Sequence, residues 1–198
     1  MIAQQIPVVV IAAMDSQRGI GRDNRMAWKI DDELAFFHKM TTNPRRLYSG
    51  HTDHQNVVIM GRKTWESIPP AHLPMTGRLN IVLSRNRSYT AKGATVVHSF
   101  EKAFKVAVQA ESSYVFIIGG GDVYRQAVHL REVDGVILTY INGDYDCDVF
   151  FPEIPEELQA HHWSLGTNLS GDVGFIIQGC ARCGGKYNMP SLTQRLSP

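Results

Sequence analysis

Cysteine is scarce in this chain: three cysteines occur among 198 residues. Small disulfide-stapled folds need several paired cysteines, so an odd count of three in a chain of this length excludes that class. A chain of this size can bury a substantial core without disulfides or metals. We therefore expect free thiols, a reducing compartment and cytoplasmic localisation.

Long hydrophobic runs and an excess of one charge are also missing. No run of about 18 apolar residues occurs, which predicts that no helix spans a membrane. The start, MIAQQIPVVVIAAM, lacks a basic segment and is typical of a strand rather than a secretory signal. The 20 basic and 19 acidic residues give a net charge of +1 without a basic block, which argues against nucleic acid as a partner. We expect a monomer that acts on a small molecule.

Continuous apolar runs alternate with helical patterns along the chain. A run such as VVVIAAM, residues 8 to 14, indicates a strand buried on both faces, and Ser99 begins an amphipathic helix. This alternation predicts an α/β fold with a mainly parallel sheet flanked by helices, whose ligands bind at the carboxyl ends of the strands. We expect one catalytic domain over residues 1–183 and a tail over residues 184–198.

The segment MAWKIDDELAFF, residues 26 to 37, places a carboxylate on an apolar helix face. If the helix begins at Asp31, Glu33 lies within the arc formed by Phe36, Phe37 and Met40. One interpretation is an acidic first turn with Asp31 as the N-cap, favoured by the helix dipole. The other is that Glu33 lies at the floor of an apolar cleft, where a ligand's hydrogen-bond donors meet its charge.

Glycine and basic residues follow three predicted strands. Gly119-Gly120-Gly121 joins a buried strand to a helix, but residue Tyr124 replaces the last glycine of G-x-G-x-x-G, and no Gly-Lys-Ser/Thr follows. The alternatives are a phosphate-binding turn and a tight structural turn. Two other strand ends carry Gly61-Arg62-Lys63-Thr64 and Leu83-Ser84-Arg85. Together they favour a ligand with several phosphates, and the basic clusters favour NADPH over NADH, although Arg62 or Arg85 alone is equally typical of a surface charge.

A metal site has little support in the sequence. Cys180 and Cys183 form one C-x-x-C pair, and His51 and His54 could supply two more ligands, but no second C-x-x-C occurs. We predict no bound metal.

An ordered set of stretches over residues 6 to 181 resembles the dihydrofolate reductase family. The set comprises VVVIAAM, GIGRDNRMAW, DDELAFF, VVIMGRKTWESIP, GRLNIVLSR, VFIIGGGDVY, ILTYI and CDVFFP. The resemblance implies a single twisted, mixed eight-stranded sheet flanked by helices. It also implies NADPH-dependent reduction of 7,8-dihydrofolate to tetrahydrofolate. The alternatives are a riboflavin-pathway reductase of related fold and a non-catalytic pterin- or nucleotide-binding module.

The resemblance implies a role for individual side chains at the substrate. Glu33 would hydrogen-bond the pterin, supported by Thr139, while Met26 contacts the reacting rings and Trp28 holds a water. These four are the expected catalytic residues. Arg78 would pair bidentately with the α-carboxylate of the glutamate tail. The full expected substrate set is Ile11, Ala12, Ala13, Glu33, Leu34, Phe37, Ile68, Leu73, Arg78, Ile118 and Thr139.

The resemblance also implies a cofactor-binding set around the glycine turn. A cis peptide would join Gly119 to Gly120, and the helix start would hold the pyrophosphate. The full expected cofactor set is Ala13, Ile20, Gly21, Gly61, Arg62, Lys63, Thr64, Leu83, Ser84, Arg85, Ile118, Gly119, Gly120, Gly121, Asp122, Val123 and Tyr124.

One position departs from the family pattern and generates a prediction. The family usually has Pro where this chain has Ala27, between Met26 and Trp28. Proline fixes φ and removes an N–H, so the alanine leaves the loop over the nicotinamide less restricted. We expect Ala27→Pro to alter the rate of cofactor release while activity is kept. Stopped-flow measurement of NADPH release tests this, and an unchanged off-rate would contradict it.

Overall fold

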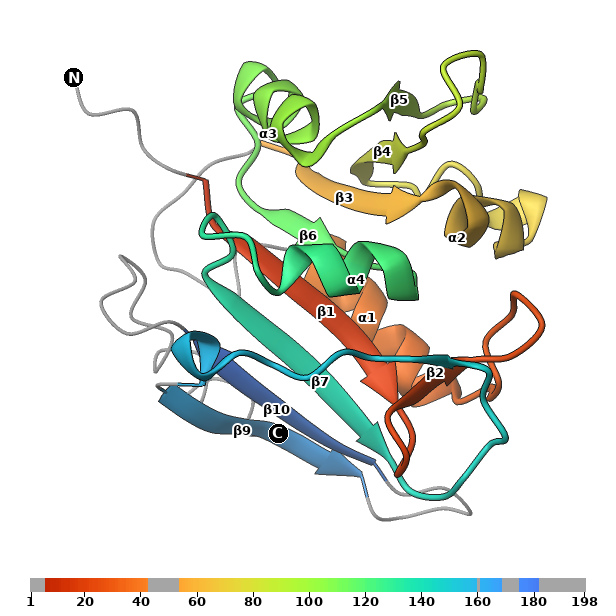
Figure 1. Cartoon of the computed structure of the whole chain (residues 1–198), viewed down its shortest axis with the longest axis vertical. Helices are drawn as coiled ribbons and strands as arrows, with labels where there is room; N and C mark the ends of the chain where they lie inside the picture. Colours follow the sequence, from red (N-terminus) through yellow and green to blue (C-terminus); the bar gives the residue numbers. More distant parts are fainter. Residues whose placement is uncertain (1–5, 43–53, 160, 169–174, 182–198) are drawn as a thin grey trace.

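An eight-stranded mixed sheet runs through the molecule in the order β5-β4-β3-β6-β1-β7-β10-β9. We describe it from a computed structural model that covers residues 6–42, 54–159, 161–168 and 175–181 (Figure 1). Strands from β5 across to β7 pair in parallel, whereas β10 pairs antiparallel with both β7 and β9. The strands are β1 Val8–Met14, β3 Asn56–Gly61, β4 Arg78–Leu83, β5 Thr95–Val97, β6 Val115–Ile117, β7 Gly135–Ile141, β9 His161–Asn168 and β10 Phe175–Ala181.

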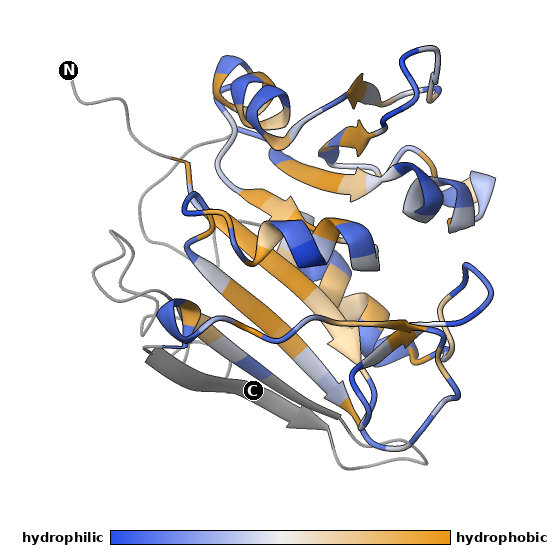
Figure 2. Cartoon of the chain, in the orientation of Figure 1, coloured by the Kyte–Doolittle hydropathy of each residue, from blue (hydrophilic) through white to orange (hydrophobic). Residues whose placement is uncertain are grey.

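Two apolar cores cover the two faces of the sheet. Val8 and Val10 of β1 lie in the core beneath α3 and α4, while Val9 and Ile11 lie in the core beneath α1 and α2. Figure 1 shows α4 in front of β1 and α1 behind it, and Figure 2 shows the central strands as hydrophobic. Strands covered on both faces carry continuous apolar runs, which is the pattern of the sequence. The helices are α1 Asp31–Thr42, α2 Arg62–Ser67, α3 Phe100–Gln109 and α4 Gly121–Ala127.

The predicted α/β architecture is confirmed, and three short elements are additions to it. A separate two-stranded sheet pairs β2 (Gly19–Gly21) with β8 (Val149–Phe150), and 3-10 turns occupy Pro70–His72 and Glu156–Leu158. Elements of two or three residues are too short to show a hydrophobic period, which is why the sequence did not predict them.

The expected helix starts differ in how well they agree with the structure. Ser99 caps α3 as expected, because its Oγ accepts a hydrogen bond from the Lys102 backbone N–H (3.3 Å). The sequence also offers Thr64 as the cap of a short helix, and this prediction is wrong: α2 has Gly61 at its N-cap position and no side-chain cap, so Thr64 lies inside the helix.

The carboxyl ends of the parallel strands place the predicted motifs at one edge of the sheet. The loop to α1 follows β1, α2 follows β3, Ser84 follows β4, and the triple glycine follows β6. Their convergence brings together segments far apart in the sequence, as expected for a ligand site in an open α/β sheet. The tail at residues 184–198, together with His51 and Cys183, lies outside the described residues. Within the described ranges, no helix is long and apolar enough to cross a membrane.

Candidate active site

Glu33 is buried in the apolar core on the α1 side of the sheet. Its residue surface is 5% exposed, and Phe36, Phe37 and Met40 of the same helix pack in the adjacent core. Burial disfavours the charged form and raises the pKa of Glu33 to about 7. Among the described residues, none donates a hydrogen bond to this carboxylate. The structure therefore favours the second interpretation, a carboxylate inside an apolar site.

Tyr124 packs beside the triple-glycine turn. The Tyr124 hydroxyl donates to the Ile11 carbonyl oxygen (2.8 Å), and the ring is buried. Burial raises the pKa of Tyr124, and the charge of Glu33 raises it further. A Cβ at Gly119 would lie 3.1 Å from the Tyr124 ring. Tyr124 therefore supports the glycine turn through close packing.

The triple-glycine turn has the backbone geometry that the resemblance implied. The Gly119–Gly120 peptide is cis, and Gly119 has a φ of +113°, a conformation that favours glycine. The Gly119 carbonyl oxygen accepts from the Gly61 N–H (2.7 Å), which joins the ends of β3 and β6. A Cβ at Gly120 would lie 3.0 Å from the Thr64 hydroxyl, so the turn presents bare backbone beside α2.

The basic residues near the turn are not equivalent. Arg62 is exposed, pairs with both oxygens of Glu66 (3.1 Å each), and lies over the Tyr89 ring at 5.7 Å. Lys63 and Arg85 are also exposed, whereas Ser84 is buried and its Oγ accepts from the Asn86 N–H (3.2 Å). In this structure Arg62 therefore forms a surface ion pair with Glu66, as the surface-charge interpretation expects.

Arg78 is a buried cation without an anionic partner among the described residues. Its residue surface is 8% exposed. Its guanidinium donates to the Thr41 hydroxyl (2.7 Å) and the Thr76 carbonyl oxygen (3.1 Å). Desolvation lowers its pKa, because burial penalises an unpaired charge. The sequence did not predict Thr41 and Thr76 as the groups that orient this side chain.

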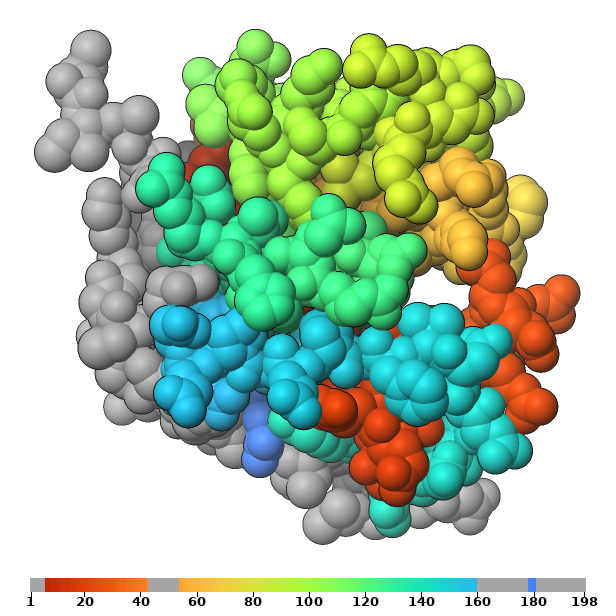
Figure 3. Space-filling model, viewed as in Figure 1, coloured from red at the N-terminus to blue at the C-terminus, as the bar shows by residue number. Residues whose placement is uncertain are grey.

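The loop between β2 and α1 approaches the site from the other side. Trp28 is buried, and its indole Nε1 has no hydrogen-bond partner among the residues that the structure describes, whereas Met26 is 49% exposed. The Asn24 side-chain amide donates to the Lys63 carbonyl oxygen (3.2 Å), which connects the loop to α2. Figure 3 shows a gap in the surface bounded by α4 (green), α2 (amber) and this loop (orange-red).

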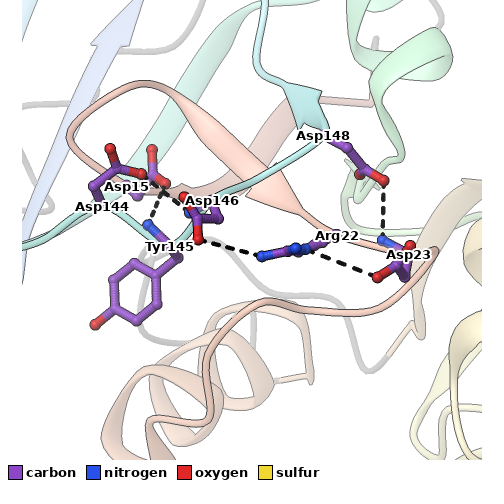
Figure 4. A network of polar contacts seen from close by, with 7 residues as sticks. All are labelled: Asp15, Arg22, Asp23, Asp144, Tyr145, Asp146 and Asp148. Carbon is purple, nitrogen blue, oxygen red and sulfur yellow. Dashed lines mark hydrogen bonds and ion pairs between the residues drawn. The ribbon is translucent and has the colours of Figure 1, made fainter.

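Polar contacts tie this loop to the acidic segment before β8 (Figure 4). The Asp23 N–H donates to Asp148 Oδ2 (3.1 Å), and Arg22 pairs with Asp146 (3.4 Å). Asp15, at the end of β1, accepts from the Tyr145 N–H (3.2 Å). The sequence did not predict these contacts, because the partners lie more than a hundred positions apart.

The structure distributes the remaining predicted residues between the two cores. The side chain of Ala12 lies in the core beneath α3 and α4, away from Ile11, because successive side chains on a strand point to opposite faces. Thr139 is buried, but no hydrogen bond joins it to Glu33 in this structure. Leu34 is 38% exposed. The core that contains Ile11 also contains Ala13, Phe37, Ile68, Leu73 and Ile118, while the other contains Ile20, Leu83, Val123 and Tyr124.

The described residues contain no group of three or more His, Cys, Asp or Glu side chains arranged to hold a metal ion. His51 and Cys183 fall outside those residues. The described cysteines, Cys147 and Cys180, are free thiols.

Comparison with known proteins gives consistent matches. The dihydrofolate reductase family model matches residues 7–168. Dihydrofolate reductase of Pneumocystis carinii is 37% identical over 157 residues, covering 75% of each chain. Dihydrofolate reductase of Sus scrofa is 36% identical over 157 residues, covering 76% of this chain and 82% of its own. Bifunctional dihydrofolate reductase-thymidylate synthase of Glycine max is 34% identical over 152 residues, and the match spans 28% of its length.

The buried carboxylate generates a prediction about stability. Because the pKa of Glu33 rises from 4.5 to about 7 on folding, the folded state holds the proton more tightly. Its contribution to the free energy of unfolding is therefore present below pH 4.5 and is lost as pH rises to about 7. We expect Glu33→Gln to stabilise the ligand-free protein by about 2–3 kcal/mol at pH 8 and by little at pH 4.5.

Urea unfolding at both pH values measures this difference. Glu157→Gln, at an exposed carboxylate, is the matched control and should leave the pH dependence as in the wild type. Equal stability of wild type and Glu33→Gln at pH 8 would contradict the assigned desolvation.

Proposed function

Because this chain belongs to the dihydrofolate reductase family, we propose that it reduces 7,8-dihydrofolate to 5,6,7,8-tetrahydrofolate with NADPH as the hydride donor. The observation that carries the proposal is the carboxylate of Glu33, which is buried in an apolar site and receives no hydrogen bond from any of the described residues. A pterin ring offers N–H donors that can replace those missing partners. The bifunctional plant relatives are much longer than this chain, so the proposal concerns only the reductase reaction.

Glu33 supports binding and protonation of the pterin through its charge. Hydrogen bonds from the 2-amino group and N3 of the ring would favour the ionised carboxylate and lower its pKa from about 7. The resulting negative charge in a low-dielectric site stabilises a ring that gains a proton at N5. Since Glu33 reaches N3, we propose that the proton arrives through water near Met26.

Trp28 is suited to hold that water. Its buried Nε1 is a donor only, and no acceptor for it lies within the described ranges of the chain. A buried donor without an acceptor carries a desolvation penalty, which a bound water or ligand removes. The indole lies in the loop that also carries Met26, so one loop orders the water and covers the reacting ring.

The site residues fit a nicotinamide dinucleotide at the glycine turn. At Gly120, a Cβ would lie 3.0 Å from the Thr64 hydroxyl, so the absence of a side chain lets this hydroxyl lie close to the backbone of the turn, where both could contact a phosphate. Lys63, Ser84 and Arg85 lie at the neighbouring strand ends and would hold further phosphate charge. When bound, the cofactor supplies the hydride, while the chain aligns the two rings and excludes water.

Arg78 supports recognition of the glutamate tail. It is a buried guanidinium, held by Thr41 and Thr76, with donors still available to a carboxylate. The planar guanidinium can donate two parallel hydrogen bonds to one carboxylate. The carboxylate of the glutamate tail would then supply the anionic partner that Arg78 lacks among the described residues.

The free thiols support a proposal about the cellular location of the enzyme. The described cysteines, Cys147 and Cys180, are free rather than paired, as expected in a reducing compartment. We propose cytoplasmic localisation on this basis.

The central test is NADPH oxidation followed at 340 nm with dihydrofolate as the substrate. We expect turnover in the wild type, and a loss of about 100-fold or more at neutral pH in Glu33→Gln, because the site then lacks its negative charge. NADPH binding should survive in the variant, and Glu157→Gln should behave as the wild type. Absence of dihydrofolate-dependent oxidation in the wild type would reject the proposed function in favour of a non-catalytic binding module.

A second prediction concerns Arg78→Lys. Lysine keeps the charge but loses the fork, so the KM for dihydrofolate should rise by about 10- to 100-fold, the range expected for hydrogen bonds to a charged group. The KM for NADPH should not change. A dihydropterin without a glutamate tail is the matched control substrate, because its reduction should be equally fast in the wild type and the variant. An equal loss with both substrates would show that Arg78 acts on folding rather than on the tail.

A further inference from the structure

Asp15 is a buried carboxylate that the proposed mechanism leaves unused. Its residue surface is 2% exposed. Oδ1 accepts from the backbone N–H groups of Gln17 (2.9 Å) and Gly19 (2.7 Å), and Oδ2 accepts from the Tyr145 N–H (3.2 Å). Burial alone would raise the pKa of Asp15, but these bonds and one from the Cys147 thiol lower it on balance. Asp15 is therefore ionised, and both of its carboxylate oxygens accept hydrogen bonds.

These contacts join two loops that are distant in the sequence. The turn after β1 contains Asp15 and Gly19, and the acidic loop contains Tyr145 and Cys147 (Figure 4). The packing between them is close: a Cβ at Gly19 would lie 2.4 Å from the Cys147 Cβ. Ser16 adds two hydrogen bonds to the Gly143 carbonyl oxygen, from its N–H (3.0 Å) and its hydroxyl (2.7 Å).

The acidic loop in turn contacts Trp28. The rings of Tyr145 and Trp28 meet edge to face, with centroids 5.3 Å apart and an interplanar angle of 66°. The Tyr145 hydroxyl does not take part, because it faces the exposed Asn142 carbonyl oxygen (3.5 Å). Among the described residues, none accepts a hydrogen bond from Trp28 Nε1, so the position of the indole depends on packing contacts such as this one.

We propose that Asp15 and Tyr145 are positioning residues that fix the indole of Trp28 at the substrate site. Asp15 holds the Tyr145 backbone, and the Tyr145 ring holds the indole at its edge. The proposal rests on the proposed function, because it assigns the geometry of Trp28 in that reaction to two residues that touch neither substrate nor cofactor. The hydroxyl of Tyr145 is dispensable and its ring is not.

Tyr145 variants give the direct test. Tyr145→Leu should shift the fluorescence of Trp28 to the red and raise its quenching by acrylamide, because the indole loses its aromatic contact. The KM for dihydrofolate should rise by about three- to tenfold, the equivalent of one aromatic pair, while the KM for NADPH is unchanged. Tyr145→Phe keeps the ring and should restore both the emission and the KM. The contribution of Trp28 to the emission is obtained by subtracting the spectrum of the matching Trp28→Phe protein.

Asp15 variants test the first half of the arrangement. Asp15→Asn weakens the acceptor at the Tyr145 N–H and should shift the Trp28 emission in the same direction as Tyr145→Leu. Asp144→Asn is the matched control: its carboxylate accepts the Asp146 N–H in the same way (3.1 Å), but it is exposed, and the variant should leave the emission unchanged.

A double-mutant cycle separates positioning from general destabilisation. In a Trp28→Phe background, Tyr145→Leu should raise the KM for dihydrofolate less than in the wild type. Equal effects in both backgrounds, an unchanged Trp28 emission in Tyr145→Leu, or failure of Tyr145→Phe to restore the KM would each overturn the proposal. If the wild type does not reduce dihydrofolate, the proposed function fails, and the emission measurements still decide whether these residues position the indole.

Discussion

The site depends on one constraint: the Glu33 side chain is buried, and none of the residues in the described part of the chain donates a hydrogen bond that would replace the lost hydration of its carboxylate. Ionisation of such a group is unfavourable, and this raises its pKa to about 7. The rest of the fold keeps the carboxylate in this environment. Helix α1 packs its apolar residues against the sheet around Glu33. A ligand that supplies donors offsets the cost, so folding stability and ligand affinity are coupled at this residue.

Two cationic positions show that charge alone does not define a binding site. Arg62 is exposed and already paired with Glu66, so an incoming anion must compete with a carboxylate that is in place. Arg78 is buried, oriented by neutral oxygens, and without an anion among the described residues, so an anion there adds a partner without displacing one. Screening by solvent further weakens the exposed pair. The buried guanidinium is the better prepared of the two for a carboxylate.

Most of the fold and part of the site were accessible from the sequence. Continuous apolar runs such as Val8–Met14 identify strands covered on both faces, and the position of Glu33 on an apolar helix face raised the question that its burial answers. The side-chain direction of Ala12 and the absence of a Thr64 cap were not predicted. Neither was the contact between Asp15 and Tyr145, since it joins residues 130 positions apart and follows only from the way β1 and β7 lie side by side. Local pattern reports which face of an element is apolar, but it does not report which loops meet.

The hydrogen bond from the Asn24 side chain to the Lys63 carbonyl oxygen determines how firmly the loop before α1 is held to α2. It is one neutral hydrogen bond between an exposed amide and a backbone oxygen, and such a bond contributes on the order of 1 kcal/mol. Thermal motion breaks a contact of that strength readily, so this bond holds the loop to α2 only weakly. Loss of this bond would release the loop from α2 at Asn24, while the contacts of Arg22 and Asp23 with the acidic segment would still hold the loop.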